Sequence, residues 1–218
     1  MELALYTQNL GYYAGGAAKI GKGGDFTTAP EMTTLFGATL ASFVASLNLP
    51  TPLRLMEFGA GSGKLAEDFL QAARDIGLDV ADYLIVELSS DLRDRQQQRL
   101  SQHVQVGWLD APPSSFTGLV LCNEVLDAMP VPLVVRENGR WLERGVSLNG
   151  EQFVFVDRDV DQAICHQIPD AADLADGYLT EVHPRQEAFV SLLGEMLQAG
   201  KGGIAILIDY GFPAREYY

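Results

Sequence analysis

The sequence is poor in cysteine, histidine and lysine. Its 218 residues contain two cysteines and three histidines, and its lysines are Lys19, Lys22, Lys64 and Lys201. The cysteines and histidines show no spacing typical of a disulfide framework or a zinc site. We therefore expect neither a disulfide-stapled scaffold nor a bound metal.

The sequence also lacks a long apolar run. The longest uncharged stretch, residues 32–53, is interrupted by polar residues and prolines, which makes it unsuitable as a membrane span. The N-terminus shows neither a secretory signal pattern nor an Arg-rich transit pattern. We expect a cytoplasmic protein that does not insert into membranes.

Basic residues are outnumbered by acidic ones. The 29 acidic and 15 basic residues give a formal net charge of −14, and no polybasic cluster is present. Such a charge repels phosphate backbones and anionic lipid surfaces. Nucleic acid is therefore a poor candidate partner, and neutral or cationic partners fit better; the sequence does not indicate an oligomeric state.

The length favours one elaborated domain over two full ones. After Pro50 and Pro52, short apolar runs alternate with helical segments, a pattern typical of an α/β fold with a doubly wound, mostly parallel sheet. The predicted strands are 53–58, 83–88, 104–107, 118–122 and 204–209. The predicted helices are 63–76, 91–100 and 185–198.

An insertion interrupts this alternation before the fifth predicted strand. Asn138-Gly139 and Asn149-Gly150 separate runs rich in Val, Leu and Phe, which predicts a three-stranded antiparallel meander over about 131–157. We expect a core of residues 51–218 that carries this insertion, preceded by an N-terminal flap and helix in residues 1–50.

The N-terminal part contains a glycine-rich segment, Gly11 to Gly24, which predicts a mobile flap. Thr28 and Glu31 have the spacing of a capping box, with Pro30 in the first turn, and predict a helix. In that helix a 3.6-residue period predicts one buried stripe, made of Leu35, Phe36, Leu40, Phe43, Val44 and Leu47.

A glycine loop is the main candidate for a binding site. Glu57 precedes Gly59, Gly61 and Gly63 between a predicted strand and a predicted helix. Glycines at alternate positions allow a sharp turn and a close approach to a ligand, and the helix N-terminus offers free N–H donors. A tight strand-to-helix turn without a ligand would show the same pattern.

Glu87, at the end of the next predicted strand, strengthens the nucleotide interpretation because an acidic side chain there can accept hydrogen bonds from two ribose hydroxyls. The alternative is an exposed carboxylate or a cap for the helix that follows. Asp110, after the third predicted strand, is placed to accept from an adenine amino group, or else is a turn residue before Pro112.

Two cofactors compete for this loop, because Gly61-Ser-Gly63-Lys-Leu-Ala66 also fits the dinucleotide pattern. A pyrophosphate needs a loop clear of negative charge, and Glu57 stands two residues before Gly59. S-adenosylmethionine brings a sulfonium and an ammonium instead, which carboxylates help to hold. Glu57 therefore favours S-adenosylmethionine over a nicotinamide dinucleotide.

The fourth predicted strand ends in a second polar group, Asn123, Glu124 and Asp127. If a helical turn begins here, Glu124 and Asp127 share a face and can anchor a guanidinium near the methyl donor. Alternatively, Asn123 and Asp127 merely cap that turn.

Several sequence blocks together resemble the MidA family of methyltransferases, over essentially the whole chain. The blocks are Leu5-Tyr6, Gly11-Tyr12-Tyr13, Gly24-Asp25-Phe26-Thr27, Ala29-Pro30-Glu31, Phe36-Gly37, the Glu57 glycine loop, Asn123-Glu124, Asp127-Ala128-Met129-Pro130-Val131 and Asp209-Tyr210-Gly211.

The resemblance implies a class I methyltransferase fold with S-adenosylmethionine as cofactor. Mitochondrial members of the family dimethylate an arginine on a core subunit of respiratory complex I during its assembly, so we expect a protein substrate with an accessible arginine, such as a complex I-type subunit. The flap-side residues expected to border the acceptor are Asp25, Phe26, Thr27, Pro30 and Glu31. The alternatives are an NAD(P)-dependent oxidoreductase and a non-catalytic assembly factor that binds a basic client.

Both ends of the chain depart from the family pattern. The sequence starts in what resembles the middle of the family's first helix and stops shortly after the fifth predicted strand. A class I methyltransferase sheet ordinarily continues with an antiparallel hairpin, so we expect a chain that is truncated at its C-terminus.

Overall fold

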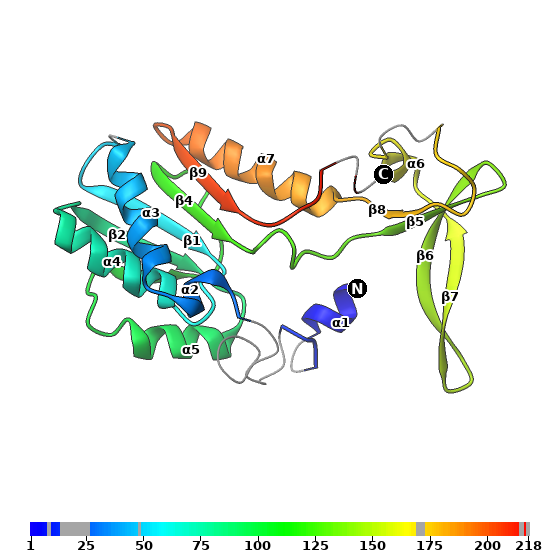
Figure 1. Ribbon diagram of the computed structural model, residues 1–218, viewed down its shortest axis with the longest axis horizontal. Helices are drawn as coiled ribbons and strands as arrows, with labels where there is room; N and C mark the ends of the chain where they lie inside the picture. Colours follow the sequence, from blue (N-terminus) through cyan, green and yellow to red (C-terminus); the bar gives the residue numbers. More distant parts are fainter. Residues whose placement is uncertain (8–9, 14–26, 48, 169–172, 214–215, 217–218) are drawn as a thin grey trace. The chain divides into compact units, whose positions relative to one another are not determined.

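The computed structural model describes residues 1–7, 10–13, 27–47, 49–168, 173–213 and 216 (Figure 1). The chain divides into two compact units. The larger unit contains residues 3–128 and 192–218, and the smaller unit contains residues 1–2 and 129–191. Most of the predicted flap, together with Asp25 and Phe26, lies outside the described residues.

A five-stranded parallel sheet forms the centre of the larger unit, with the strand order β3-β2-β1-β4-β9. Its strands are β1 (Leu53–Phe58), β2 (Val80–Val86), β3 (Val106–Leu109), β4 (Gly118–Asn123) and β9 (Gly203–Ile208). The carboxyl ends of parallel strands share one edge of the sheet, so the segments that follow β1, β2, β3, β4 and β9 are brought together there. The predicted fold class is confirmed.

Strands β2 and β3 differ most from their predicted bounds. Strand β2 starts at Val80 and ends at Val86, so Glu87 follows the strand. Strand β3 does not include Val104, which is 98% exposed; Trp108 pairs with Ile85 of β2 instead. The predicted strand starts two residues too early, because β3 begins where its residues pair with β2, at Val106 opposite Tyr83.

The larger unit also contains several helices. They are α1 (Glu2–Tyr6, whose first residue belongs to the smaller unit), α2 (Ala29–Met32), α3 (Leu35–Ser46), α4 (Lys64–Ile76), α5 (Ser90–Arg99) and the C-terminal half of α7 (Pro184–Ala199). Helices α3 and α4 share one buried cluster with β1, β2 and β4. No helix within the described residues is long and apolar enough to cross a membrane.

The buried stripe of α3 differs from the prediction. Leu35 is 70% exposed and Phe43 is 50% exposed, and the buried residues are Gly37, Leu40, Ala41 and Val44. A Cβ atom at Gly37 would lie 2.6 Å from the Cβ of Asp68 in α4. This close helix contact centres the buried face on small residues and rotates Leu35 and Phe43 outward.

The predicted capping box does not form. Thr28 is the N-cap of the four-residue helix α2, but its side chain makes no capping hydrogen bond. The chain then leaves helical geometry at Thr33 and starts α3 at Leu35. The pattern was wrong here because the Glu31 side chain has a partner outside its own helix, described below.

The smaller unit contains a four-stranded antiparallel sheet with the order β7-β6-β5-β8. Its elements are β5 (Leu133–Glu137), β6 (Arg140–Asn149), β7 (Gln152–Asp159), the short helix α6 (Gln162–Cys165) and β8 (Leu179–Glu181). The three predicted meander strands are present, and Asn138 and Gly139 both have positive φ in the first turn. The second turn uses Gly150 and Glu151, one residue later than predicted, and the three-residue strand β8 was missed.

Candidate cofactor and acceptor site

The glycine loop links β1 to α4 as predicted. Gly59, Gly61 and Gly63 have φ angles of 63°, 54° and 80°, in the left-handed region that residues other than glycine rarely adopt. Gly63 is the N-cap of α4. The alternation of glycines is therefore a backbone requirement of this turn.

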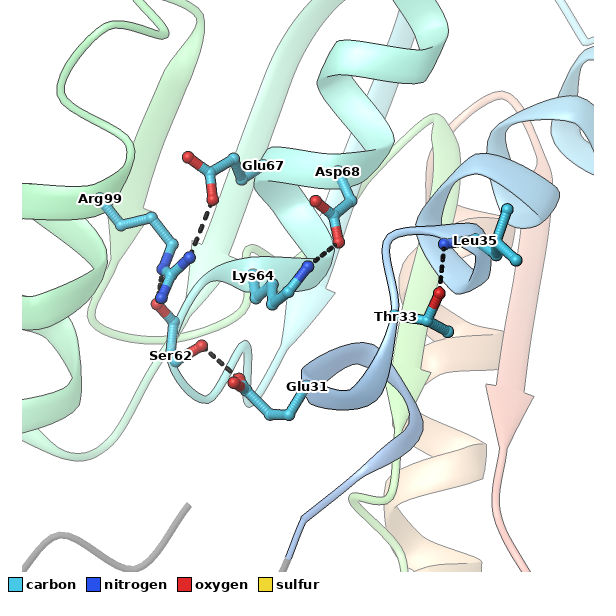
Figure 2. Close-up of polar contacts among 8 residues, drawn as sticks. All are labelled: Glu31, Thr33, Leu35, Ser62, Lys64, Glu67, Asp68 and Arg99. Carbon is cyan, nitrogen blue, oxygen red and sulfur yellow. Dashed lines mark hydrogen bonds and ion pairs between the residues drawn. The ribbon is translucent and has the colours of Figure 1, made fainter. Parts of the chain in front are cut away.

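Helix α5 holds two consecutive carbonyl groups of the loop. Gln96 Nε2 donates to the Gly61 carbonyl at 2.9 Å, and Arg99 Nε donates to the Ser62 carbonyl at 3.0 Å. Figure 2 shows that Arg99 also contacts Glu67, through Nη1 at 2.9 Å. The carbonyl oxygens of Gly61 and Ser62 thus face α5. The groups of this part of the loop that can bind a ligand are its backbone N–H donors. Within the described part of the chain, the N–H groups of Gly61 and Ser62 have no hydrogen-bond partner.

The opposite side of the loop is tied to α2. The hydroxyl of Ser62 donates to Oε1 of Glu31 (Figure 2). Lys64, at the start of α4, pairs with Asp68 one turn later. Of the predicted flap-side residues, Glu31 thus reaches the glycine loop, Pro30 is buried in α2 and Thr27 is exposed.

Glu57 lies beneath the loop and is enclosed by protein. Its side chain is 2% exposed, and its Oε2 accepts a hydrogen bond from the Tyr83 hydroxyl at 2.7 Å. Burial raises the pKa of Glu57 from 4.5 to about 7, and the Tyr83 hydrogen bond opposes this shift. The carboxyl group can therefore change its charge near neutral pH.

Glu87 directly follows β2, and two neighbours hold its carboxylate. Oε1 accepts from the N–H of Ser89 at 2.9 Å, and Oε2 accepts from Gln96 Nε2 at 2.9 Å. Burial raises the pKa of Glu87, and these hydrogen bonds counteract the increase. The bond to Ser89 matches the capping alternative, yet the lone pairs that remain on both oxygens can still accept from ribose hydroxyls.

Asp110 follows β3 directly. Its side chain is 90% exposed and pairs with Nη1 of Arg93 in α5 at 2.5 Å. This pairing leaves acceptor capacity on the carboxylate, so the adenine contact stays a prediction.

The second polar group follows β4, but not as a helical turn. Glu124 has a φ of 51°, and its N–H donates to the carbonyl of Ile208 in β9 at 2.8 Å. This left-handed residue ends the strand and redirects the chain, so the predicted helical turn is wrong. Glu124 nevertheless lies close enough to Asp127 and Asp209 that, after burial, their charges raise its pKa.

Asp209 and Tyr210, which follow β9, organise this segment. The Asp209 Oδ2 accepts from the N–H groups of Leu126 and Asp127, at 3.1 Å and 3.2 Å. The Tyr210 hydroxyl donates to Asp127 Oδ2 at 2.7 Å. The N–H groups of Leu126 and Asp127 are therefore capped by Asp209. Asn123, the other residue proposed as a cap, is the last residue of β4.

Tyrosines near the N-terminus reach the same segment. The Tyr6 hydroxyl donates to the Ala128 carbonyl at 2.7 Å, and the Tyr6 and Tyr13 rings stack with centroids 5.5 Å apart. Burial and the charge of Asp127 raise the pKa of Tyr13. Sequence reasoning did not assign these tyrosines to the site, although both belong to blocks shared with the MidA family.

The donor and acceptor groups are neighbours. Phe58 of β1 pairs with Cys122 of β4, so the glycine loop and the Asn123–Asp127 segment start side by side. A Cβ atom at Gly59 would lie 3.4 Å from Cγ2 of Val125. A methyl donor on the loop would therefore be adjacent to the carboxylates that follow β4.

This arrangement defines a class of protein. A parallel sheet of order β3-β2-β1-β4-β9, with a glycine loop after its central strand β1 and an acidic residue after β2, is the core of a Rossmann-like methyltransferase that uses S-adenosylmethionine. A family model described as a putative S-adenosyl-L-methionine-dependent methyltransferase matches residues 35–218, and the chain belongs to this family. The resemblance to MidA proteins is confirmed.

A solved structure supports the same cofactor. A likely methyl transferase from Burkholderia thailandensis, in a crystal structure with bound S-adenosyl-homocysteine, is 44% identical and superposes with a TM-score of 0.88. The match covers 100% of this chain and 58% of that chain. The cofactor is S-adenosylmethionine, and the nicotinamide alternative is set aside.

Curated relatives carry a more specific name. The chain is 28% identical to proteins named "Protein arginine methyltransferase NDUFAF7 homolog, mitochondrial" from Drosophila melanogaster and Caenorhabditis elegans. Each match covers 97% of this chain, and 55% and 57% of the respective relatives. The chain thus spans little more than half the length of these relatives.

Proposed function

We propose that this protein transfers a methyl group from S-adenosylmethionine to a guanidinium nitrogen of an arginine in another protein. The observation that carries the proposal is the group of three carboxylates, Glu124, Asp127 and Asp209, beside the glycine loop. Neighbouring carboxylates repel one another and favour a bound cation. The name of the curated relatives supports arginine as that cation.

The chemistry needs orientation more than acid–base power. The guanidinium nitrogen would attack the methyl carbon in line with the sulfonium, the carbon–sulfur bond would break with its electrons left on sulfur, and the nitrogen would release a proton to solvent. Alignment of the reacting atoms lowers the barrier by removing orientational freedom. Glu124 and Asp127 would hold the guanidinium through charge-assisted hydrogen bonds, and Asp127 is itself held by Tyr210.

The cofactor fits the residues that precede α4 and follow β2. The positive φ angles of Gly59, Gly61 and Gly63 support a close backbone approach, with the N–H groups of the loop facing the ligand. Glu87 would accept from the ribose hydroxyls. Asp110 would accept from the adenine amino group.

Glu57 has a different place in this proposal. Its enclosure against Tyr83 supports an electrostatic role beneath the loop rather than direct contact. Its ionised form would favour the positively charged cofactor.

A respiratory complex I-type subunit is the client that the family resemblance implies. A basic client also suits the chain's net charge of −14. The second candidate function, a non-catalytic assembly factor for a basic client, is favoured by the same charge and needs no methyl transfer.

A methyl-transfer assay separates the two functions. The protein is incubated with methyl-labelled S-adenosylmethionine and a lysate that contains complex I-type subunits, and modified residues are identified by mass spectrometry. Label on arginine, lost in Glu124→Gln, supports the proposal. Label on another residue type contradicts arginine specificity, and stable client binding without label favours the assembly factor.

A further inference from the structure

Helix α5 buries one polar side chain, Gln96. Gln96 is 0% exposed, whereas the neighbouring residues Arg95 and Gln97 are exposed. Gln96 is the only buried residue of α5. A glutamine is rarely enclosed in this way unless all its hydrogen-bonding groups are satisfied.

Gln96 satisfies these groups with three different segments. Its Nε2 donates to the Gly61 carbonyl and to Glu87 Oε2, both at 2.9 Å, and its Oε1 accepts from Trp108 Nε1 at 3.0 Å. The reverse orientation of the amide would oppose an oxygen to two acceptors and a nitrogen to a donor. The three neighbours therefore allow one orientation of the side chain.

We propose that Gln96 is a positioning residue for the cofactor and acts through Glu87. This inference rests on the proposed contact between Glu87 and the ribose. Gln96 holds Oε2 of Glu87 while Ser89 holds Oε1, which fixes the rotation of the carboxylate and leaves outward lone pairs for two hydroxyls. Because it also holds the Gly61 carbonyl, Gln96 sets the separation between the glycine loop and Glu87.

Trp108 determines the orientation of the Gln96 amide. Its indole N–H can only donate, so the amide oxygen and not the amide nitrogen must face it. Trp108 lies in β3 and pairs in register with Ile85 of β2, two residues before Glu87. The hydrogen bonds thus connect β2, β3, α5 and the glycine loop through one side chain.

The test compares two ligands that differ only in the ribose. Dissociation constants are measured for S-adenosylhomocysteine and for its analogue that lacks both ribose hydroxyls. In Gln96→Met, which keeps the length of the side chain, affinity for S-adenosylhomocysteine should fall about tenfold more than affinity for the analogue, as expected for a lost hydrogen bond to a charged group. Gln97→Met, on the exposed face of the same helix, should leave both affinities unchanged.

Equal losses for the two ligands would overturn the proposal, because they would show a general structural effect. The Glu87→Gln background provides a second check, since there Gln96→Met should no longer change the ratio of the two affinities. If Gln96→Met does not fold, Trp108→Phe removes the donor that orients the amide and keeps an aromatic ring at that position. An unchanged ratio in folded Trp108→Phe would then overturn the proposal.

These measurements need no methyl acceptor. A failure of arginine specificity would leave the ratio of affinities unaffected. If the wild-type protein bound both ligands equally, the ribose contact of Glu87 would be wrong, and the role of Gln96 would fall with it.

Discussion

The carboxylate of Asp209 caps the backbone of Asp127, although 82 residues separate them along the chain. The same Oδ2 atom also accepts from the N–H of Leu126, so one oxygen caps the start of the turn that carries Asp127. Asp209 directly follows β9 and Asp127 lies four residues after β4. The parallel pairing of β4 with β9 is therefore what assembles the candidate acceptor site.

Replacing Asp209 should disorder this turn without removing the cofactor site. Asp209→Ala removes the acceptor of two backbone N–H groups in an exposed turn, where a hydrogen bond contributes about 0.5–1.5 kcal/mol. We expect methyl transfer to fall at least tenfold while the dissociation constant of S-adenosylhomocysteine stays within twofold. Asp79→Ala, at an exposed position before β2, is the matched control. Loss of cofactor affinity in Asp209→Ala would place Asp209 in the donor site.

Removing the charge of Glu124 should affect the acceptor and not the donor. Glu124→Gln keeps the size of the side chain, and we expect it to bind S-adenosylhomocysteine normally but to lose most methyl transfer to arginine. Glu195→Gln on the exposed face of α7 should behave as wild type in both assays. Normal turnover by Glu124→Gln would exclude the proposed carboxylate role.

A side chain at Gly61 should abolish cofactor binding. Gly61 has a φ of 54°, a conformation that a β-branched residue adopts only with strain, and the added atoms would occupy the space proposed for the ligand. We expect Gly61→Val to retain the circular dichroism spectrum of the wild type and to show no measurable binding of S-adenosylmethionine. Gly194→Ala, where a Cβ atom meets no neighbour within 4 Å, is the control. Undiminished affinity in folded Gly61→Val would contradict the loop assignment.

The buried carboxyl group of Glu57 should make stability depend on pH. Its pKa rises from 4.5 to about 7 on folding, mainly through burial, so the folded state binds a proton more tightly than the unfolded state. This contribution to stability is complete below pH 4.5 and is lost as the pH rises through about 7, with a total of about 3 kcal/mol. Urea unfolding of the ligand-free protein should therefore show a steeper loss of stability between pH 5 and pH 8 than unfolding of Glu57→Gln. Parallel profiles for the two proteins would show that Glu57 does not titrate in this range.

Local sequence was sufficient for the central elements of the fold. Strand β1, the glycine loop and helix α4 are contiguous, and their pattern of apolar residues followed by alternating glycines reflects backbone requirements within about 25 residues. The Asn138-Gly139 turn is similarly local, because both residues must adopt positive φ. The alternation of strands and helices predicted a parallel sheet, whereas the order of its strands comes from the structure.

The sequence did not reveal the contacts made across the fold. The residues 90–99 of α5 are almost entirely polar, and no periodicity distinguishes buried Gln96 from exposed Gln97. Glu31 has the spacing of a helix cap, yet its partner is Ser62 of the glycine loop. Hydrogen bonds of this kind depend on which segments the sheet brings together, and the local pattern carries no information about them.

The strand–loop–helix unit for the cofactor can therefore be predicted from local sequence, because its backbone geometry requires glycine at three nearby positions. The contacts of Gln96 with Glu87 and of Asp209 with the segment containing Asp127 depend instead on the packing of distant segments. The physical reason is that a polar side chain can be satisfied by many partners, and the parallel register of β2, β3, β4 and β9 selects the one that lies within hydrogen-bond distance.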